Sequence, residues 1–370
     1  MMKRIFTLFL IALLTVSLAA CGGSGTTDTS GTEGGNPSSG VTDTAGGDPG
    51  STDTDEVKSV VYDPEMEHKI IVADDGNHRV VVYDLNAGGE DFQDLTDESK
   101  SVVWEWDMDE DPNTEYKSHG AGLSSAKYRY SPYYKKDVVI ACSSTGWCGI
   151  IDYEERCVLW EYNAARGPHS VEMLPNGDLI VAVSTQDASR LIYFPVSCGM
   201  TQPSHEVEIL YAHGVSWDPE RECLWVLEYN GVCCVNISNM GTENAKFVQI
   251  AGVGDTFKTS SNGGHAFSPV GGEPGKYWAS NNGSLVVFDA EEETLSFNYR
   301  HRDLLDSAGI KGICSFADGT VVRVYWDSTL HILTRREVQG KVSSVKATET
   351  EVSFPTGRFY KVQPFTKDYQ

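Results

Sequence analysis

The chain has 370 residues, a length that fits either one large domain or two ordinary ones. It carries 29 Lys and Arg residues against 53 Asp and Glu residues, so its formal net charge is −24. This balance argues against nucleic acid and anionic lipid as general partners, because both are negatively charged themselves. The exclusion applies to the surface as a whole and is compatible with a local cationic site.

The first 20 residues have the pattern of an export signal. Lys3 and Arg4 precede an apolar run over residues 5–18, which is short for a membrane-spanning helix. The run ends in Leu18-Ala19-Ala20-Cys21, which resembles a bacterial lipoprotein signal that is cut before a cysteine. We therefore expect residues 1–20 to be a lipoprotein signal peptide and Cys21 to be lipidated. The alternative is an ordinary secretory signal with an incidental cysteine.

Residues 21–56 form a distinct segment. Almost all of them are Gly, Ser, Thr, Asp or Pro, and none is large enough to build a core. This composition predicts a flexible acidic tether. The protein is thus expected to be exported and lipid-anchored to the bacterial cell membrane or outer membrane, facing outward, with its folded domain in residues 57–370.

The first strands of that domain flank a tight turn. Residues 70–74 and 80–84 are rich in β-branched residues, and a polar turn separates them. The turn resembles a repeat of NHL-type propellers, in which an Asp, an Asn and an Arg join the strands of a blade. The resemblance implies a structural role for Asp74, Asn77 and Arg79.

A hairpin pattern that begins with histidine then recurs along the chain. In residues 167–182, His169 starts a strand, Pro175-Asn176-Gly177 makes a turn, and a second apolar strand follows. The pattern returns at His213 and His265, and at Lys311 with lysine in place of histidine. The steps are 44 residues (169 to 213), 52 (213 to 265) and 46 (265 to 311), a period typical of β-propeller blades.

The strand count predicts an all-β, six-bladed β-propeller with four strands in each blade. The first blade lacks its innermost strand, and residues 358–363 supply one strand that belongs to no other blade. Because an open ring would leave strand edges unpaired, we expect this C-terminal strand to join the first blade and close the ring.

Eight cysteines follow Cys21. An even number in an exported protein would allow disulfides. Most of these cysteines lie within apolar strand patterns, which favours free thiols packed in the core. They are Cys142, Cys148, Cys157, Cys198, Cys223, Cys233, Cys234 and Cys314.

The repeats place chemistry at the propeller axis. Innermost strands line a central channel, so equivalent positions in different blades converge there. His169, His213, His265 and Lys311 share one such position. The same alignment puts Ala126 there in the second blade, with Lys127 and Arg129 beside it, whereas His119 is expected in the loop that enters this blade.

Three interpretations of this cluster remain open. His169, His213 and His265 have the donor type that binds a divalent transition metal such as Zn, Mn or Fe. Alternatively, the cluster holds a carboxylate, sulfate or phosphate through charge-assisted bonds, which the neighbouring Lys127 and Arg129 favour. In the third interpretation each histidine only satisfies backbone groups of the next blade.

The cluster also has a possible catalytic use. A lysine or histidine among His169, His213, His265 and Lys311 that titrates near neutral pH would abstract a proton next to a carboxylate, as in a uronate-specific lyase. This comparison rests on architecture. Trp147, which we expect in a turn, is the candidate platform for stacking on a sugar.

The hairpin motifs resemble an uncharacterised family of bacterial six-bladed propeller proteins. The resemblance lies in Pro168-His169-Ser170 with Leu174-Pro175-Asn176-Gly177, His213-Gly214-Val215, Gly263-Gly264-His265 and Lys311-Gly312-Ile313, and it extends over about residues 70–362. It implies a propeller, often with a lipoprotein signal, and no established activity. Ala266-Phe267 departs from the pattern, which has an acidic residue followed by leucine there.

From these features we expect a monomeric envelope lipoprotein that binds a small acidic ligand, such as a uronate or another acidic carbohydrate, at the channel mouth. Its only expected membrane attachment is the lipid anchor, and nucleic acid is not expected as a partner. Whether the ligand is turned over stays open. The alternative is a non-catalytic scaffold in which the histidines are structural.

Overall fold

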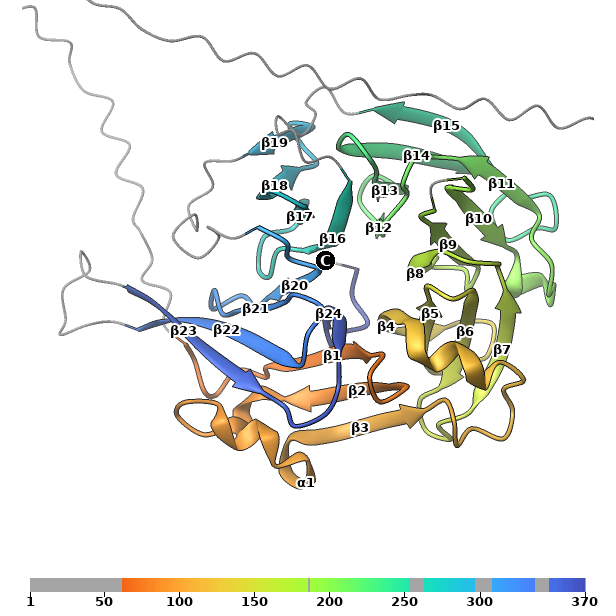
Figure 1. Ribbon diagram of the computed structural model, residues 1–370. Helices are drawn as coiled ribbons and strands as arrows, with labels where there is room; N and C mark the ends of the chain where they lie inside the picture. Colours follow the sequence, from red (N-terminus) through yellow and green to blue (C-terminus); the bar gives the residue numbers. More distant parts are fainter. Residues whose placement is uncertain (1–61, 186, 253–262, 297–307, 337–345, 370) are drawn as a thin grey trace, which may run out of the picture. The chain divides into compact units, whose positions relative to one another are not determined.

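The computed structural model describes residues 62–185, 187–252, 263–296, 308–336 and 346–369. They form a ring of six four-stranded antiparallel sheets (Figure 1), which confirms the predicted six-bladed propeller. The predicted signal peptide, Cys21 and the tether lie outside the described residues. Within the described ranges, no helix is long and apolar enough to cross a membrane.

Each blade runs from an innermost strand at the axis to an outermost strand at the rim. In that order, blade 1 consists of β24 (Phe359–Pro364), β1 (Lys69–Asp74), β2 (Arg79–Asp84) and β3 (Val102–Asp107). Blade 2 consists of β4 (Leu123–Ser131), β5 (Lys136–Ser143), β6 (Trp147–Asp152) and β7 (Val158–Asn163). Blade 3 consists of β8 (Pro168–Met173), β9 (Leu179–Val183), β10 (Arg190–Phe194) and β11 (His205–Glu208).

The other three blades have the same order. Blade 4 consists of β12 (Gly214–Asp218), β13 (Cys223–Leu227), β14 (Val232–Ser238) and β15 (Lys246–Gly252). Blade 5 consists of β16 (Gly264–Pro269), β17 (Lys276–Asn281), β18 (Leu285–Asp289) and β19 (Thr294–Ser296). Blade 6 consists of β20 (Gly312–Ser315), β21 (Val321–Val324), β22 (Thr329–Arg336) and β23 (Lys346–Ser353).

The described helical segments are short and lie in the connections. They are η1 (Leu85–Gly88), η2 (Gln93–Thr96), α1 (Glu98–Ser101), η3 (Lys117–Gly122) and η4 (Val196–Cys198).

The C-terminal strand closes the ring, as predicted. β24 pairs antiparallel with β1, and Val362 lies opposite Val72. The innermost strand of blade 1 therefore comes from the opposite end of the chain from the other three strands of that blade. Its pairing removes the open edge of β1.

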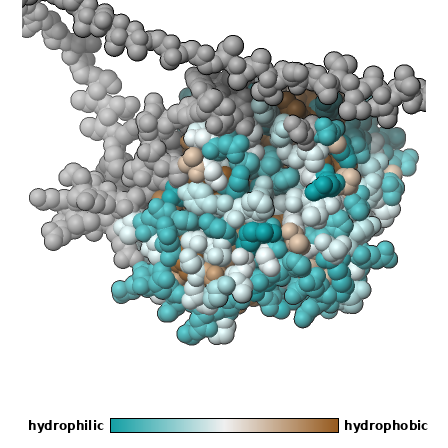
Figure 2. All heavy atoms as spheres, viewed as in Figure 1, coloured by the Kyte–Doolittle hydropathy of each residue, from teal (hydrophilic) through white to brown (hydrophobic). Residues whose placement is uncertain are grey.

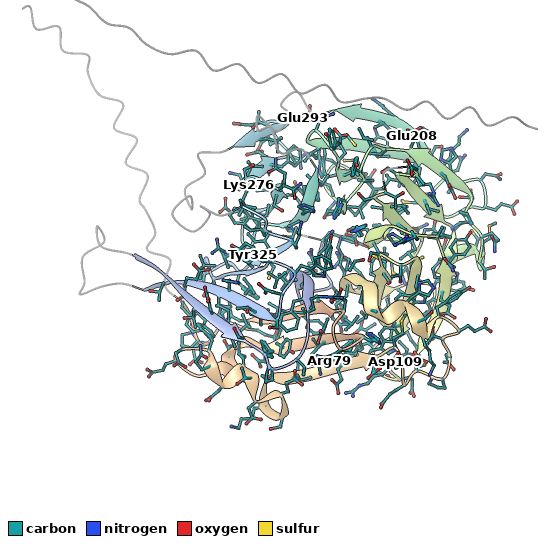
Figure 3. The ribbon with its side chains drawn as sticks, viewed as in Figure 1. Arg79, Asp109, Glu208, Lys276, Glu293 and Tyr325 are labelled. Atoms are coloured by element: carbon teal, nitrogen blue, oxygen red, sulfur yellow. The ribbon has the colours of Figure 1, made fainter. Side chains whose placement is uncertain are left out.

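The core lies between neighbouring blades. One apolar cluster joins Trp106 of blade 1 to Trp147 of blade 2, whose rings stack with centroids 5.5 Å apart. Another joins Tyr83 of blade 1 to Val322 of blade 6, across the point where the ring closes. Burial of apolar surface between the blades holds the ring together. Hydrophilic residues are the most frequent on the part of the face that Figure 2 shows in colour, and Asp109, Glu208 and Glu293 lie at the periphery in Figure 3.

The first turn has the predicted hydrogen bonds. The buried carboxylate of Asp74 accepts bonds from the side chain of Asn77 at 2.8 Å and from Nε of Arg79 at 3.1 Å. It also accepts a bond from the backbone N–H of Arg358 at 2.9 Å. Asp74 thus ties the first hairpin to the segment that leads into β24.

The eight cysteines after Cys21 are free thiols, as the strand patterns favoured. Five of them are buried, namely Cys142, Cys148, Cys223, Cys233 and Cys314. They pack as small apolar side chains.

Candidate functional site

The structure brings the three predicted histidines together. The ring centroids of His169 and His213 are 4.2 Å apart, and those of His213 and His265 are 5.0 Å apart. Each histidine lies at or just before the start of an innermost strand. Since these strands share one direction around the ring, their first residues meet at the same end of the channel.

The position of His169 depends on a bulge. Pro168 pairs with Val183 and Ser170 with Ala182, so His169 is the extra residue between two paired positions. In β4 the corresponding extra residue is Ser124, between Leu123 and Ser125. The predicted equivalent, Ala126, is therefore displaced by two residues. The sequence alignment counted residues back from the proline that follows each strand. This count is wrong for β4, because β4 has nine residues and β8 has six.

Hydrogen bonds orient the imidazoles. Nδ1 of His169 lies 2.6 Å from the carbonyl oxygen of Gly167, so this nitrogen carries the proton and Nε2 has the lone pair. His213 contacts two hydroxyl groups, Ser184 Oγ at 3.0 Å from Nδ1 and Tyr360 Oη at 3.2 Å from Nε2. Nε2 of His265 lies 2.8 Å from Nζ of Lys311, whereas its buried Nδ1 has no partner among the described residues.

A second lysine, which the sequence pattern did not indicate, belongs to this cluster. Lys361 of β24 is buried, and its Nζ donates hydrogen bonds to the carbonyl oxygens of His169 at 2.7 Å and His213 at 2.6 Å. The sequence does place Lys361 near the axis, because the C-terminal strand is predicted to be an innermost strand. That strand lies outside the hairpin repeats, however, so their alignment assigns no channel position to Lys361.

The cluster is electrostatically unusual. Burial, together with the nearby lysines, lowers the pKa of His169 and of His265 to about 4 and lowers that of His213 as well. Burial lowers the pKa of Lys361 to about 7 and also lowers that of Lys311. At neutral pH the three imidazoles are therefore uncharged, and the positive charge of the cluster resides on the two lysines.

An exposed tryptophan lies at the edge of the cluster. Trp326 is 48% exposed, and its ring centroid is 6.0 Å from that of Tyr360, which in turn packs against His169. The indole Nε1 donates to Asp75 at 3.1 Å. The backbone of Trp326 has a φ of 70°, a left-handed conformation that is costly for a bulky residue.

Trp147 is not available as the predicted sugar platform. It is the first residue of β6 and not part of a turn, its side chain is fully buried, and Nε1 donates to Glu161 at 2.9 Å. The ring lies over Gly149, where a Cβ would be 2.3 Å from the indole. The missing side chain at Gly149 lets Trp147 fold into the core between the blades.

Lys127 and Arg129 bind a carboxylate instead of joining the histidines. Nζ of Lys127 lies 2.8 Å from Glu172, and Arg129 Nε lies 2.9 Å from the same carboxylate. All three side chains are buried. The carboxylate of Glu172 is thus shared by Lys127 and Arg129.

His119 is also apart from the cluster. It lies in η3, in the connection that enters blade 2, as expected, and its Nδ1 is 2.8 Å from Thr145 Oγ1. Its ring packs edge-on against Tyr116, with centroids 5.7 Å apart.

The metal interpretation has little support from the geometry. Among the described residues, the only group of three possible ligands whose atoms lie within 4.8 Å of one another is His331, Glu349 and Glu351 on the outer strands of blade 6. His169, His213 and His265 do not form such a group, although their rings are adjacent. A shared metal on these histidines stays a prediction.

The comparisons with known proteins identify a family without an established activity. A protein of unknown function from Bacteroides caccae is 12% identical, with 81% of this chain and 99% of that chain covered and a TM-score of 0.42. A functionally unknown protein from Desulfotomaculum acetoxidans is 13% identical, with 76% and 80% covered and a TM-score of 0.45. Hydrazine synthase of Kuenenia stuttgartiensis is 10% identical, with 70% of each chain covered and a TM-score of 0.43.

These structural likenesses are too distant to support an argument about function. No curated protein matches the sequence. The model of a family of unknown function, DUF6528, matches residues 58–330.

Proposed function

This chain belongs to the DUF6528 family of unknown function, and we propose that its propeller binds a small acidic ligand, such as a uronate or another acidic carbohydrate, at the histidine end of the central channel. The observation that carries the proposal is the presence of two lysines, Lys311 and Lys361, beside uncharged imidazoles and without a carboxylate partner among the described residues.

A counter-charge would stabilise the protonated form of the two lysines. Taking an ammonium group out of water costs several kcal/mol unless an anion or good hydrogen bonds replace the water. The protein has a net charge of −24, so carboxylates are abundant elsewhere in the chain. A ligand carboxylate between Lys311 and Lys361 would supply the missing charge through short, charge-assisted hydrogen bonds.

The uncharged imidazoles suit the rest of such a ligand. A neutral imidazole offers one N–H donor and one acceptor, which match sugar hydroxyl groups. Nε2 of His169 has no partner in the described part of the chain. The ring of Tyr360 packs against His169 on one side and against the exposed ring of Trp326 on the other. An aromatic face beside polar groups is a common way to hold a sugar ring.

The same site supports a proposal of catalysis. A neutral Lys361 keeps two N–H bonds to the carbonyls of His169 and His213 and holds a lone pair in the remaining tetrahedral direction. That lone pair would remove the proton next to the carboxylate of a uronate, the electron pair of the broken C–H bond would form the double bond, and the C–O bond to the neighbouring sugar would break. The departing sugar oxygen would take a proton from water, and the Lys361 ammonium would return its proton to water. Lys311 would stabilise the negative charge that develops on the carboxylate.

We further propose that the protein is exported and anchored through a lipid on Cys21. The support is the sequence pattern of residues 1–21. Metabolic labelling with a radioactive fatty acid tests this point. Label should enter the wild-type protein and be absent from Cys21→Ala, and equal labelling of both proteins would refute lipidation at Cys21.

The binding proposal is tested by calorimetric titration with galacturonate oligomers and with neutral galactose oligomers. We expect the acidic oligomers to bind at least tenfold more tightly. Lys311→Met should lose most of this preference, because Lys311 supplies positive charge at the site. Lys100→Met is the matched control, since it removes one exposed lysine from α1 in the outer part of blade 1 and should leave the preference intact.

Equal affinity for acidic and neutral oligomers, or no effect of Lys311→Met, would refute the anion site and favour the scaffold alternative. Catalysis is measured separately by the ultraviolet absorbance of an unsaturated uronate product. Binding without product would retain the binding proposal and reject the lyase reaction.

A further inference from the structure

A second pocket lies at the other end of the channel. Its lining includes Pro269, Ser315 and Pro364, the last residues of β16, β20 and β24. The histidine cluster lies at the first residues of the innermost strands, so the two sites are at opposite ends of the propeller axis. The pocket has a volume of about 300 Å³, at the lower end of the range for small-molecule sites.

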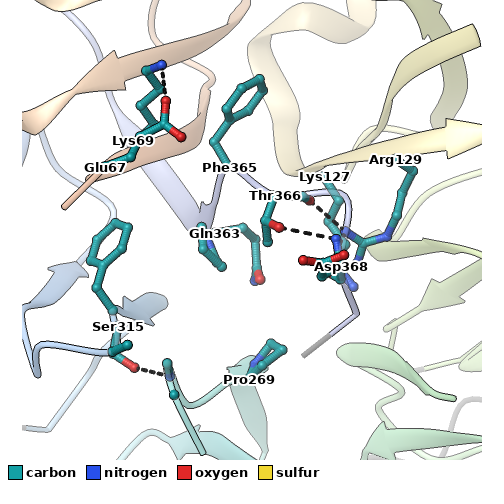
Figure 4. Close-up of a pocket in the computed structure, with 15 residues that line it drawn as sticks. Glu67, Lys69, Lys127, Arg129, Pro269, Ser315, Gln363, Phe365, Thr366 and Asp368 are labelled. Atoms are coloured by element: carbon teal, nitrogen blue, oxygen red, sulfur yellow. Dashed lines mark hydrogen bonds and ion pairs between the residues drawn. The ribbon is translucent and has the colours of Figure 1, made fainter. Parts of the chain in front are cut away.

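The pocket has a cationic inner part. Lys127 and Arg129 line it (Figure 4), and both bind the buried carboxylate of Glu172. Two cations and one carboxylate give this group a formal charge of +1, while Glu67, Lys69 and the exposed Asp368 elsewhere in the lining add −1. Lys127 is 4% exposed and Arg129 is 6% exposed. Water therefore stabilises the positive charge of these two side chains poorly.

Lys127 has an unused hydrogen-bond donor. Nε, Nη1 and Nη2 of Arg129 all donate bonds, to Glu172 and to the carbonyl oxygens of Tyr128, Thr366 and Asp368. Nζ of Lys127 donates to Glu172 at 2.8 Å and to the carbonyl oxygen of Val215 at 2.6 Å. An ammonium group has three N–H donors, so one donor of Lys127 has no acceptor among the described residues.

The remaining wall is mixed, and its polar members are Glu67, Lys69, Ser315, Gln363, Thr366 and Asp368. Phe316, Phe365, Ala317, Pro269 and Pro364 line the pocket, and Figure 4 shows Phe365 and Pro269 on different sides of it. A buried donor that needs an acceptor, in a pocket that also exposes two phenylalanine side chains, matches a ligand with an anionic group on an apolar body.

We propose that this pocket binds a small organic carboxylate with an apolar or aromatic body, its carboxylate directed toward Lys127. The ligand carboxylate accepts the unused N–H of Lys127 and neutralises the charge of the Lys127, Arg129 and Glu172 group. The apolar body packs against Phe316 and Phe365. This site uses different residues from the proposed carbohydrate site and opens at the other end of the axis.

The test uses the full chain and two probes of nearly equal shape, phenylacetate and its neutral amide phenylacetamide. Calorimetric titration should show one phenylacetate per chain, with phenylacetamide at least tenfold weaker. Ala317→Leu fills the pocket without touching the buried ion pairs and should weaken phenylacetate binding at least tenfold. Lys127→Met should abolish the preference for the acid over the amide.

Matched controls separate this site from the other one. Lys311→Met lies at the histidine end and should leave phenylacetate binding unchanged. Circular dichroism and thermal unfolding show whether Lys127→Met is folded. If Lys127→Met is unfolded, phenylacetate binding to Ala317→Leu still tests the proposal. The proposal is overturned by equal affinity for the two probes, by unchanged binding in Ala317→Leu, or by no saturable binding up to about 10 mM.

Discussion

The Nζ atom of Lys361 lies 2.6 Å from the carbonyl oxygen of His213, so a lysine from the last strand of the chain reaches the innermost segment of blade 4. The same atom bonds to the carbonyl of His169 in blade 3. These two bonds place a buried amine directly beside the backbone that carries two of the histidines. The charge of this amine therefore affects both the stability of the ring and the ligand proposed for this site.

Binding of an acidic ligand at the histidine end should weaken as pH rises through neutrality. Burial lowers the pKa of Lys361 to about 7, and an anion binds more tightly to the protonated form. His169 and His265, with pKa values lowered to about 4, stay uncharged over this range, and Tyr360, whose pKa burial raises, stays protonated. Affinity for a galacturonate oligomer should fall about tenfold between pH 6 and pH 8 if one proton is coupled to binding.

The matched variant for this experiment is Lys361→Met. It should bind more weakly at pH 6 and lose the steep dependence on pH. Lys311, whose pKa is also lowered by burial, is the other cation that faces the cluster, and any dependence left in Lys361→Met is assigned to it. Affinity that stays constant from pH 6 to pH 8 in the wild type would contradict a role for Lys361 in binding.

Lys361 should also make folding stability depend on alkaline pH. Its pKa is about 7 in the folded protein and 10.5 for an ordinary lysine in water, so the folded state disfavours the proton. The penalty is complete below pH 7 and disappears as pH rises toward 10.5. The free energy of unfolding of the wild type should thus rise relative to that of Lys361→Met by up to about 1.4 kcal/mol per pH unit. Urea unfolding at several pH values measures this difference, and parallel curves would rule it out.

Trp326 and Trp147 should respond differently to substitution. Trp326→Ala should weaken binding of an acidic sugar severalfold, by about 0.5–1.5 kcal/mol, with little loss of stability because the ring is half exposed. Trp147→Phe should leave affinity unchanged and lower stability by roughly 1–3 kcal/mol, since the indole and its bond to Glu161 are buried. Titration and thermal unfolding of both variants check the pattern. A binding loss in Trp147→Phe alone would reverse our assignment.

Glu172→Gln should be strongly destabilising. The carboxylate neutralises Lys127 and Arg129 in a buried site, and these cations outweigh the effect of burial and lower its pKa, so it is ionised at neutral pH. Loss of its charge leaves two buried cations and should cost roughly 3–5 kcal/mol. Glu105→Gln is the control, because its ion pair with Arg79 is exposed and should be worth at most about 1 kcal/mol. Similar losses of unfolding free energy in the two variants would show that the buried Lys127, Arg129 and Glu172 group contributes no more to stability than the Arg79–Glu105 pair.

Removal of β24 should prevent closure of the ring. A chain that ends at Gly357 lacks the innermost strand of blade 1 and leaves the edge of β1 unpaired. It should unfold without a cooperative transition or aggregate, and a peptide of residues 358–370 added in trans should restore part of the native circular dichroism. A truncated chain with the wild-type melting temperature would refute the closure role of β24.

Much of this architecture could be predicted from the chain alone. The hairpin at residues 167–182 and its copies indicated the blades, and the strand left over at residues 358–363 indicated the closure. The convergence of His169, His213 and His265 followed from their equivalent places in those hairpins. These inferences worked because strand alternation, turns and repeats are local properties that the order of residues displays directly.

Other parts depended on contacts that no local pattern displays. A count of residues places Lys127 and Arg129 with the histidines, whereas the structure gives both to Glu172, and Ser124 rather than Ala126 corresponds to His169. A bulge and an unequal strand length shift such a count by whole residues. Trp147 turned inward because Gly149 leaves room for it.

The sequence by itself determined the propeller, its six blades, its closure and the histidines near the axis, because repeated strands can bury their apolar faces only against one another. Only the tertiary structure decided which charges are paired and which are not. That distinction depends on distance and burial in three dimensions, since a charge interacts with whatever lies within a few ångströms and not with its neighbours in the chain. Lys361 and Trp326 join the candidate site for this reason, and Lys127 and Arg129 belong to the other end of the axis.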